Sequence, residues 1–115
     1  MLDGYYSHHP TIRLPRPLIL TGTFHSDTRK VAHFLAGQTG LTLLDVDDAV
    51  AHRLGMSLVG LRYRDGEYAY LKEERAELLR LVRQTPAGVI RIGRDPLTSP
   101  KVLHQAMVHG DILFV

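Results

Sequence analysis

Residues 18–40 read LILTGTFHSDTRKVAHFLAGQTG. The first four residues form a short apolar run that stops at Gly22, which is typical of a strand buried on both faces. From residue 28 to 38 the apolar residues recur three and four positions apart, which indicates an amphipathic helix. Ser26 and Asp27 are candidates for its N-cap. The stretch therefore predicts a strand, a tight loop and a helix.

Short apolar runs and helical patterns continue to alternate along the rest of the chain. We predict further strands at residues 41–45, 89–92 and 112–115, and helices at residues 46–54, 66–85 and 100–109, with a new helix cap at Ser57. Strands that alternate with helices imply right-handed crossovers between parallel strands. The expected fold class is α/β, with a parallel sheet of about four strands flanked by helices.

The pattern over residues 66–85 is the strongest helical signal in the chain. Its apolar positions, which include Tyr70 and Leu78, fall on one broad face and should pack against the sheet. Most of its charged positions fall on the other face. We therefore expect Glu74 and Glu77 to face solvent.

The composition excludes several classes of protein. The chain has 115 residues, no Cys, 44% hydrophobic residues and a formal charge of +2. A disulfide scaffold and a Cys-ligated zinc site are excluded, and no apolar run is long enough to cross a bilayer. Basic residues are scattered among acidic ones, so we expect binding neither to nucleic acid nor to membranes.

The first 17 residues differ from the remainder. They contain three prolines, which disfavour helices and central strands, and they lack the apolar stretch of a signal peptide. We predict an extended N-terminal arm at residues 1–17, a domain at residues 18–115, and a cytoplasmic location.

Three short motifs resemble those of a known family. They are Asp-Val-Asp at residues 45–47, Gly-Met-Ser at 55–57 and Gly-Glu at 66–67. With the order of strands and helices from residue 18 onward, they resemble the shikimate kinases, P-loop kinases of the nucleoside-monophosphate-kinase type. The resemblance implies that family's fold, with ATP and magnesium as cofactors, and we expect its lid and fifth strand to be absent here.

The resemblance also exposes departures in the phosphate loop. A GxxxxGK[ST] loop binds polyphosphate through backbone N–H groups, a lysine and a magnesium-ligating hydroxyl. Gly22 and Ser26 fit this pattern. Asp27, Thr28 and Arg29 stand where the second glycine, the lysine and the hydroxyl are expected. The loop is therefore predicted to be degenerate, and no catalytic residue is expected.

Asp27 is the most informative of these replacements. A carboxylate at a helix N-terminus satisfies the free N–H groups and the dipole that would otherwise attract phosphate. Arg29 and Lys30 follow the position of the missing lysine and could supply a cation. They belong to an alternative in which the chain is a divergent small-molecule kinase that uses ATP and magnesium.

The acceptor side implied by the resemblance is also altered. Asp47 corresponds to the aspartate that holds the sugar acid's hydroxyls, but Leu71 replaces an arginine that grips its carboxylate. The family's turn of three glycines reads Gly93-Arg94-Asp95 here. Arg94 could substitute for the missing arginine, so a small hydroxy acid could bind near Asp47, Gly93 and Arg94. Asp45 is a candidate magnesium contact. The competing interpretation is that Asp45 and Asp47 cap the helix that follows.

The last predicted strand runs from Ile112 to Val115 and is entirely apolar. We expect its outer edge, with the N-terminal arm, to mediate self-association or to bind another protein, unless the arm covers it. The sequence therefore predicts a shikimate-kinase-like binding or regulatory module without phosphoryl transfer. The alternatives are the divergent kinase and a sensor of shikimate-like acids.

Overall fold

The computed structural model describes residues 13–22, 27–93 and 95–115. None of the helices in this part of the chain is long and apolar enough to cross a bilayer. The predicted α/β class is confirmed. In chain order the elements are β1 (Leu18–Thr21), α2 (Thr28–Thr39), β2 (Leu43–Asp45), α3 (Val46–Leu54), α4 (Leu58–Gln84), β3 (Val89–Arg91), the 3-10 helix η1 (Asp95–Thr98), α5 (Pro100–His109) and β4 (Asp111–Phe114).

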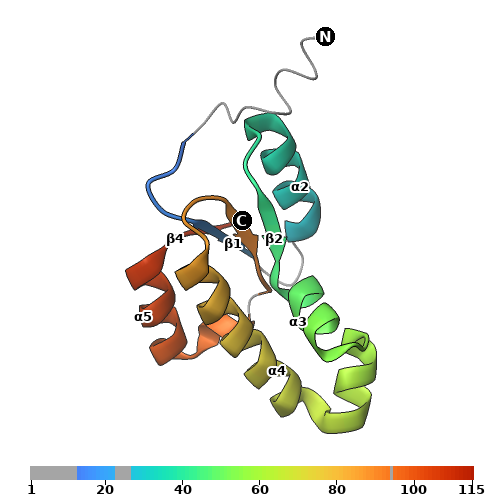
Figure 1. The fold of residues 1–115 in the computed structure, drawn as a ribbon. Coiled ribbons are helices and arrows are strands. Elements are labelled where there is room, and N and C mark those ends of the chain that lie inside the picture. The colour runs from blue at the N-terminus through green and yellow to red at the C-terminus, as the bar shows by residue number, and fades with distance from the viewer. Residues whose placement is uncertain (1–12, 23–26, 94) are drawn as a thin grey trace.

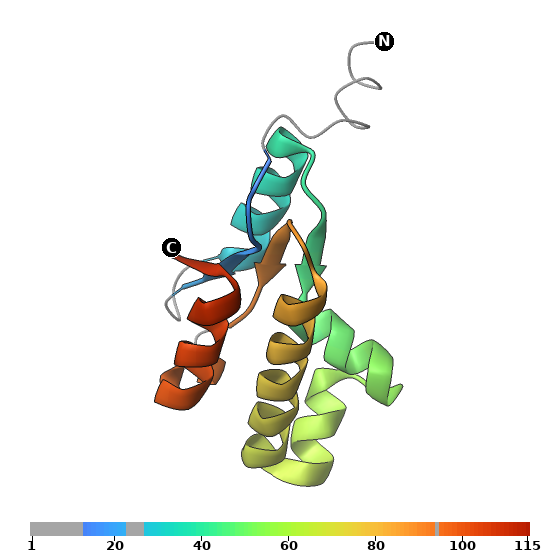
Figure 2. The ribbon, with the colours of Figure 1, turned by 60° about the vertical axis from the view of Figure 1, so that its left-hand side comes forward.

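The four strands form one sheet in the order β2-β3-β1-β4, and all three pairings are parallel. Helix α2 covers one face of the sheet, while α4 and α5 cover the other (Figures 1 and 2). The carboxyl ends of the strands therefore meet at one edge, and α2 and α3 both begin there. In open α/β sheets this is the edge at which ligands bind.

Successive side chains along each strand point to opposite faces of the sheet, and this divides the hydrophobic core into two clusters. Ile19 and Ile90 pack with the cluster formed by α3, α4 and α5, whereas Leu20 and Val89 pack against α2. All four side chains are fully buried, as expected for strands covered on both faces. Each contributes about 1.5–3 kcal/mol relative to an exposed side chain.

Helix α4 is longer than the sequence pattern predicts. The predicted range of 66–85 omits residues 58–65, which form a first helical limb behind the cap at Ser57. The Ser57 hydroxyl accepts the Gly60 N–H at 3.0 Å, so the predicted cap is confirmed. Gly66 lies between the two limbs at φ 89° and ψ 171° and produces a kink. A left-handed φ is inexpensive only for glycine, which explains why the break falls there.

The prediction that Glu74 and Glu77 face solvent is wrong, because both are buried. Glu77 pairs with Arg53 at 2.8 Å and also with Arg80. Since Arg53 lies on α3, this pair joins α3 to α4. Burial of the Glu77 charge is tolerated because two guanidinium groups compensate for lost hydration.

The described end of the predicted arm, residues 13–17, forms no helix or strand but contacts the domain. The Arg16 guanidinium donates to the carbonyls of Met107 and Gly110 at the end of α5. It also lies 3.4 Å from the carboxylate of Asp111 at the start of β4. Residues 1–12 lie outside the described part, so the division into arm and domain stays a prediction.

We predict that Arg53→Ala lowers the free energy of unfolding by about 2–3 kcal/mol, because it removes one of the two partners of the buried Glu77 carboxylate. Arg64→Ala is the control, since Arg64 pairs with Asp65 on the surface, where solvent screens the pair, and this variant should change stability far less. Urea denaturation measures both changes. Equal effects would contradict the role assigned to Glu77.

Candidate functional site

The loop between β1 and α2 opens the candidate site at the carboxyl end of β1. Gly22 is buried, and Ser26 lies outside the described residues. Asp27 is the N-cap of α2, and its carboxylate accepts the Lys30 N–H at 3.1 Å. The capping role predicted for Asp27 is therefore confirmed, and part of the helix N-terminus is satisfied within the chain.

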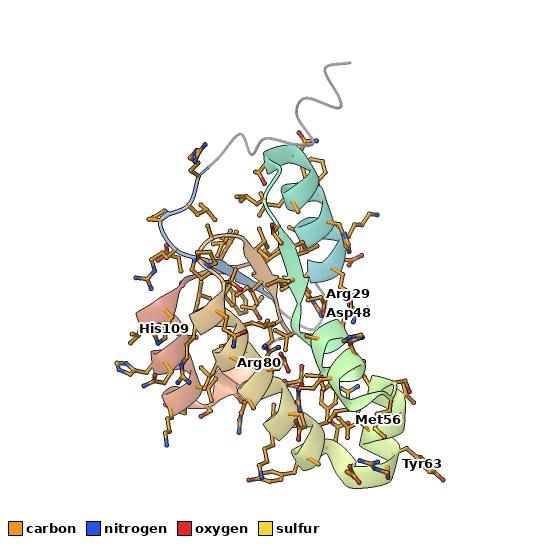
Figure 3. All side chains as sticks on the ribbon, in the orientation of Figure 1. Arg29, Asp48, Met56, Tyr63, Arg80 and His109 are labelled. Carbon is orange, nitrogen blue, oxygen red and sulfur yellow. The ribbon has the colours of Figure 1, made fainter. Side chains whose placement is uncertain are left out.

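The next three residues of this loop have different environments. Thr28 is buried, and its hydroxyl accepts a hydrogen bond of 2.9 Å from Nε of Arg91 on β3. Lys30 is exposed. Arg29 turns toward the start of α3, where its Nη2 lies 3.5 Å from Asp47 and its Nε lies 3.7 Å from Asp45. Figure 3 shows Arg29 beside Asp48, at the junction of the first turns of α2 and α3.

Asp47 is the centre of a network that we call the Asp47 cluster. Its Oδ2 lies 2.9 Å from Nη1 of Arg91, and its Oδ1 accepts the Tyr70 hydroxyl at 3.0 Å. Glu74 also hydrogen-bonds to it. The sequence predicted Asp47 as a ligand-binding residue, but both of its oxygens contact groups from other elements of the same chain. The cluster comprises Arg29, Asp45, Asp47, Tyr70, Glu74 and Arg91.

The electrostatics of the cluster follow from burial and from these contacts. Burial opposes ionisation of Asp47, but hydrogen bonds from Glu74, Tyr70 and Arg91 outweigh it and lower the Asp47 pKa. Burial and the hydrogen bond to Asp47 raise the pKa of Glu74 to about 9, so Glu74 is protonated at neutral pH. Burial and the Asp47 charge also raise the Tyr70 pKa. Glu74 and Tyr70 therefore act as neutral hydrogen-bond donors to one carboxylate.

Asp45 was predicted either as a magnesium contact or as a helix cap. It is the N-cap of α3, and its Oδ1 accepts the N–H groups of Asp47 and Asp48 at 2.9 and 3.3 Å. Its Oδ2 lies 3.5 Å from Arg91. Burial outweighs the attraction of Arg91 and raises the Asp45 pKa. The capping interpretation is confirmed for Asp45, and among the described residues no group of three or more acidic or His side chains could hold a metal.

The remaining predicted ligand residues lie after β3. The Gly93 carbonyl accepts the Thr21 hydroxyl at 3.1 Å, and Arg94 lies outside the described residues. A cavity of about 270 Å³ lies between the second limb of α4 and η1. Its described lining contains no Lys or Arg and consists of Glu67, Tyr68, Tyr70, Leu71, Glu74, Asp95 and Thr98.

Sequence reasoning missed Arg91, Tyr70 and Glu74 as members of the site. Arg91 is a charged residue between two buried isoleucines near the carboxyl end of a strand, and that placement was an available signal. Glu74 lies four residues after Tyr70 and four before Leu78, on the same helical face. From the sequence we predict solvent exposure for Glu74 and assign no role to Arg91.

We predict that Glu74→Gln makes stability less dependent on pH. The ordinary Glu74 pKa of 4.5 applies to the unfolded chain, whereas the folded pKa is about 9. The stabilisation that the protonated Glu74 side chain gives the folded state is complete below pH 4.5. It is lost as the pH rises from 4.5 to about 9, by up to ~1.4 kcal/mol per pH unit. Urea titrations across the window should show this fall in the wild type and in Glu73→Gln, but not in Glu74→Gln. Parallel profiles for all three proteins would contradict the assignment.

We also predict unequal effects for the two arginines of the cluster. The Arg91 side chain is 12% exposed and makes close contacts, so Arg91→Leu should lower the free energy of unfolding by about 3 kcal/mol. The Arg29 side chain is 51% exposed and its contacts are longer, so Arg29→Leu should cost less than ~1 kcal/mol. Chemical denaturation compares the two, and a larger loss for Arg29→Leu would refute this ranking.

The chain is similar in sequence to known proteins. No protein-family model matches the chain. The chain is 26% identical over 110 residues to the shikimate kinase of Geobacillus kaustophilus, covering 95% of this chain and 58% of that protein. It is 24% identical over 100 residues to the shikimate kinase of Geobacillus thermodenitrificans, covering 87% of this chain and 53% of that protein.

Solved structures give the same result for the fold. The shikimate kinase of Aquifex aeolicus matches with a TM-score of 0.76 and 24% identity, over 86% of this chain and 58% of that one. The enzyme of Acinetobacter baumannii, solved in complex with shikimate, matches with a TM-score of 0.76 and 18% identity, over 97% of this chain and 59% of that one. The chain is thus a homologue of the shikimate kinases in sequence, has their fold, and spans less than three fifths of the length of these relatives.

Proposed function

We propose that this chain is a binding module on a shikimate kinase fold that has lost phosphoryl transfer. The observation that carries the proposal is that both carboxylate oxygens of Asp47 already have partners within the chain. One of its oxygens accepts the Tyr70 hydroxyl, and the other lies against Arg91 and Arg29. A substrate hydroxyl at Asp47 would have to displace contacts that are already made within the fold, where an unmatched buried charge is costly.

The β1–α2 loop supports the same conclusion. Phosphate binds at a helix N-terminus because free N–H groups and the helix dipole attract an anion. Here the Asp27 carboxylate already accepts the Lys30 N–H and would repel a phosphate. Thr28 supplies no charge, and its hydroxyl is engaged by Arg91. The module is therefore proposed to need no ATP and no magnesium.

Two alternative functions would use other residues near the Asp47 cluster. The cavity beside Tyr70 and Glu74 adjoins the Asp47 cluster and could admit a small hydroxylated molecule, as expected of a sensor of shikimate-like acids. Leu71 in its lining offers no charge to a carboxylate, so this function would require Arg94. The divergent kinase would rely on Arg29 and Lys30, with Asp47 released from Arg91.

A partner protein is the remaining expectation. If the phosphate loop and Asp47 are engaged internally, binding has to occur elsewhere on the molecule. The predicted contacts are the edge of the sheet from Ile112 to Val115 and the N-terminal arm. Beyond that edge the sheet has no further strand among the described residues, so its backbone groups are open to a partner.

We predict that calorimetry detects no binding of ATP–magnesium at millimolar concentration and that no ADP is formed with shikimate present. The triple variant Asp27→Gly, Thr28→Lys, Arg29→Ser restores the GxxxxGK[ST] pattern and should gain nucleotide binding. Arg29→Ala alone is the matched control and should stay inactive. Binding of ATP–magnesium by the wild type that is lost in Arg29→Ala would instead support the divergent kinase.

A further inference from the structure

Arg91 lies at the carboxyl end of β3, against the first turn of α2. In the register of the sheet it is in line with Asp45 on β2 and with Leu20 on β1. Side chains alternate along a strand, and Val89 packs on the face that α2 covers. Arg91, two residues later, therefore points to the same face and toward the start of α2. Figure 1 shows α2 and α3 meeting at this edge of the sheet.

One guanidinium group contacts three residues at this edge. Nε of Arg91 donates to the Thr28 hydroxyl at 2.9 Å. Nη1 lies 2.9 Å from Oδ2 of Asp47 and 3.5 Å from Oδ2 of Asp45. The side chains of Arg91 and Asp45 are each 12% exposed and that of Asp47 is 11% exposed, so water screens these contacts weakly.

These three residues stand where a phosphate loop and its metal ion bring positive charge. In the GxxxxGK[ST] pattern the lysine falls at position 28 and reaches the outer phosphates of the nucleotide. The sequence predicts Asp45 as a magnesium contact and Asp47 as a ligand-binding residue. Arg91 therefore brings a cation from β3 to the place where the pattern expects one from the loop and one from a metal ion.

The charges at this edge are already balanced within the chain. The carboxylates of Asp45 and Asp47 contact the guanidinium groups of Arg91 and of the more exposed Arg29. A lysine at position 28 would lie against Arg91, because the Thr28 side chain already contacts its Nε. A magnesium ion on the two carboxylates would meet the same guanidinium in a poorly hydrated setting, where like charges repel strongly. Neither cation fits beside Arg91.

We infer that Arg91 is a built-in cation that takes the place of both the lysine and the magnesium ion and so blocks the nucleotide site. A loop that had lost only its lysine would leave Asp45 and Asp47 free, whereas Arg91 engages both. Restoring the loop alone therefore restores only part of the affinity for a nucleotide. The inference rests on the proposed function, because it names the residue that enforces the loss of phosphoryl transfer.

Substitutions at positions 28 and 91 test the inference without any nucleotide. Thr28→Lys should lower the urea midpoint of the wild type more than Thr28→Met, which adds a chain of similar length without charge. In the Arg91→Gln background the order should reverse, because a lysine then supplies the cation that Asp45 and Asp47 have lost. Arg91→Gln removes the charge but keeps a hydrogen-bond donor.

The sign of the coupling between the two positions decides the outcome. The inference is overturned if Thr28→Lys is less stable than Thr28→Met in both backgrounds, or in neither. The comparison in the wild-type background needs no Arg91 variant, so equal midpoints there overturn it even where Arg91→Gln does not fold. Arg53→Gln is the matched control background, since it removes a guanidinium from the buried Glu77 and should keep the wild-type order.

Calorimetry tests the consequence for the nucleotide site. The triple variant Asp27→Gly, Thr28→Lys, Arg29→Ser restores the loop pattern but retains Arg91. Adding Arg91→Gln should raise its affinity for ATP–magnesium at least tenfold, whereas adding Arg53→Gln should not. Equal affinities after the two additions, or no binding by any of these proteins, would overturn the inference.

The two experiments separate this inference from the proposed function. Binding of ATP–magnesium by the wild type overturns the proposed function and with it the block by Arg91. A wild type that does not bind the nucleotide, together with additive effects at positions 28 and 91, overturns only the role of Arg91.

Discussion

The arrangement of this molecule depends on the contacts made by the ionised carboxylate of Asp47. This carboxylate is reached by Arg91 from β3, by Arg29 from α2 and by Tyr70 from α4, while Asp47 itself lies in the first turn of α3. A buried carboxylate is stable only when its charge and lone pairs are matched. The same contacts that meet this requirement hold three helices and the sheet in register at the carboxyl ends of the strands.

That requirement has a consequence for function. In a P-loop kinase fold the carboxyl edge of the sheet is where phosphates, cations and substrates gather. Here the positive charge is supplied by guanidinium groups of the chain, and Asp27 supplies the negative charge at the α2 N-terminus. The groups that the sequence predicts to bind ligands instead contact each other within the fold. This is why similarity of fold to the shikimate kinases does not by itself assign their activity to the chain.

The sequence predicted most of the fold, because short apolar runs and helical patterns are local signals. The four strands, the parallel sheet and the caps at Asp27, Asp45 and Ser57 all followed from such signals. The first limb of α4 was missed because residues 58–65 span only about two helical turns, too few for a helical period to stand out, and they include Gly60, which weakens a helical pattern. The Asp47 cluster was only half predicted, since partners such as Arg91 and Glu74 come from distant elements and charged residues are normally solvated.

A crystal structure of the chain grown with ATP and magnesium tests the central claim most directly. The account predicts that the Asp27 carboxylate remains on the Lys30 N–H, that Arg91 remains on Asp47, and that no nucleotide is bound at the β1–α2 loop. Phosphate groups held by the backbone N–H groups of that loop, with Asp27 displaced, would contradict it.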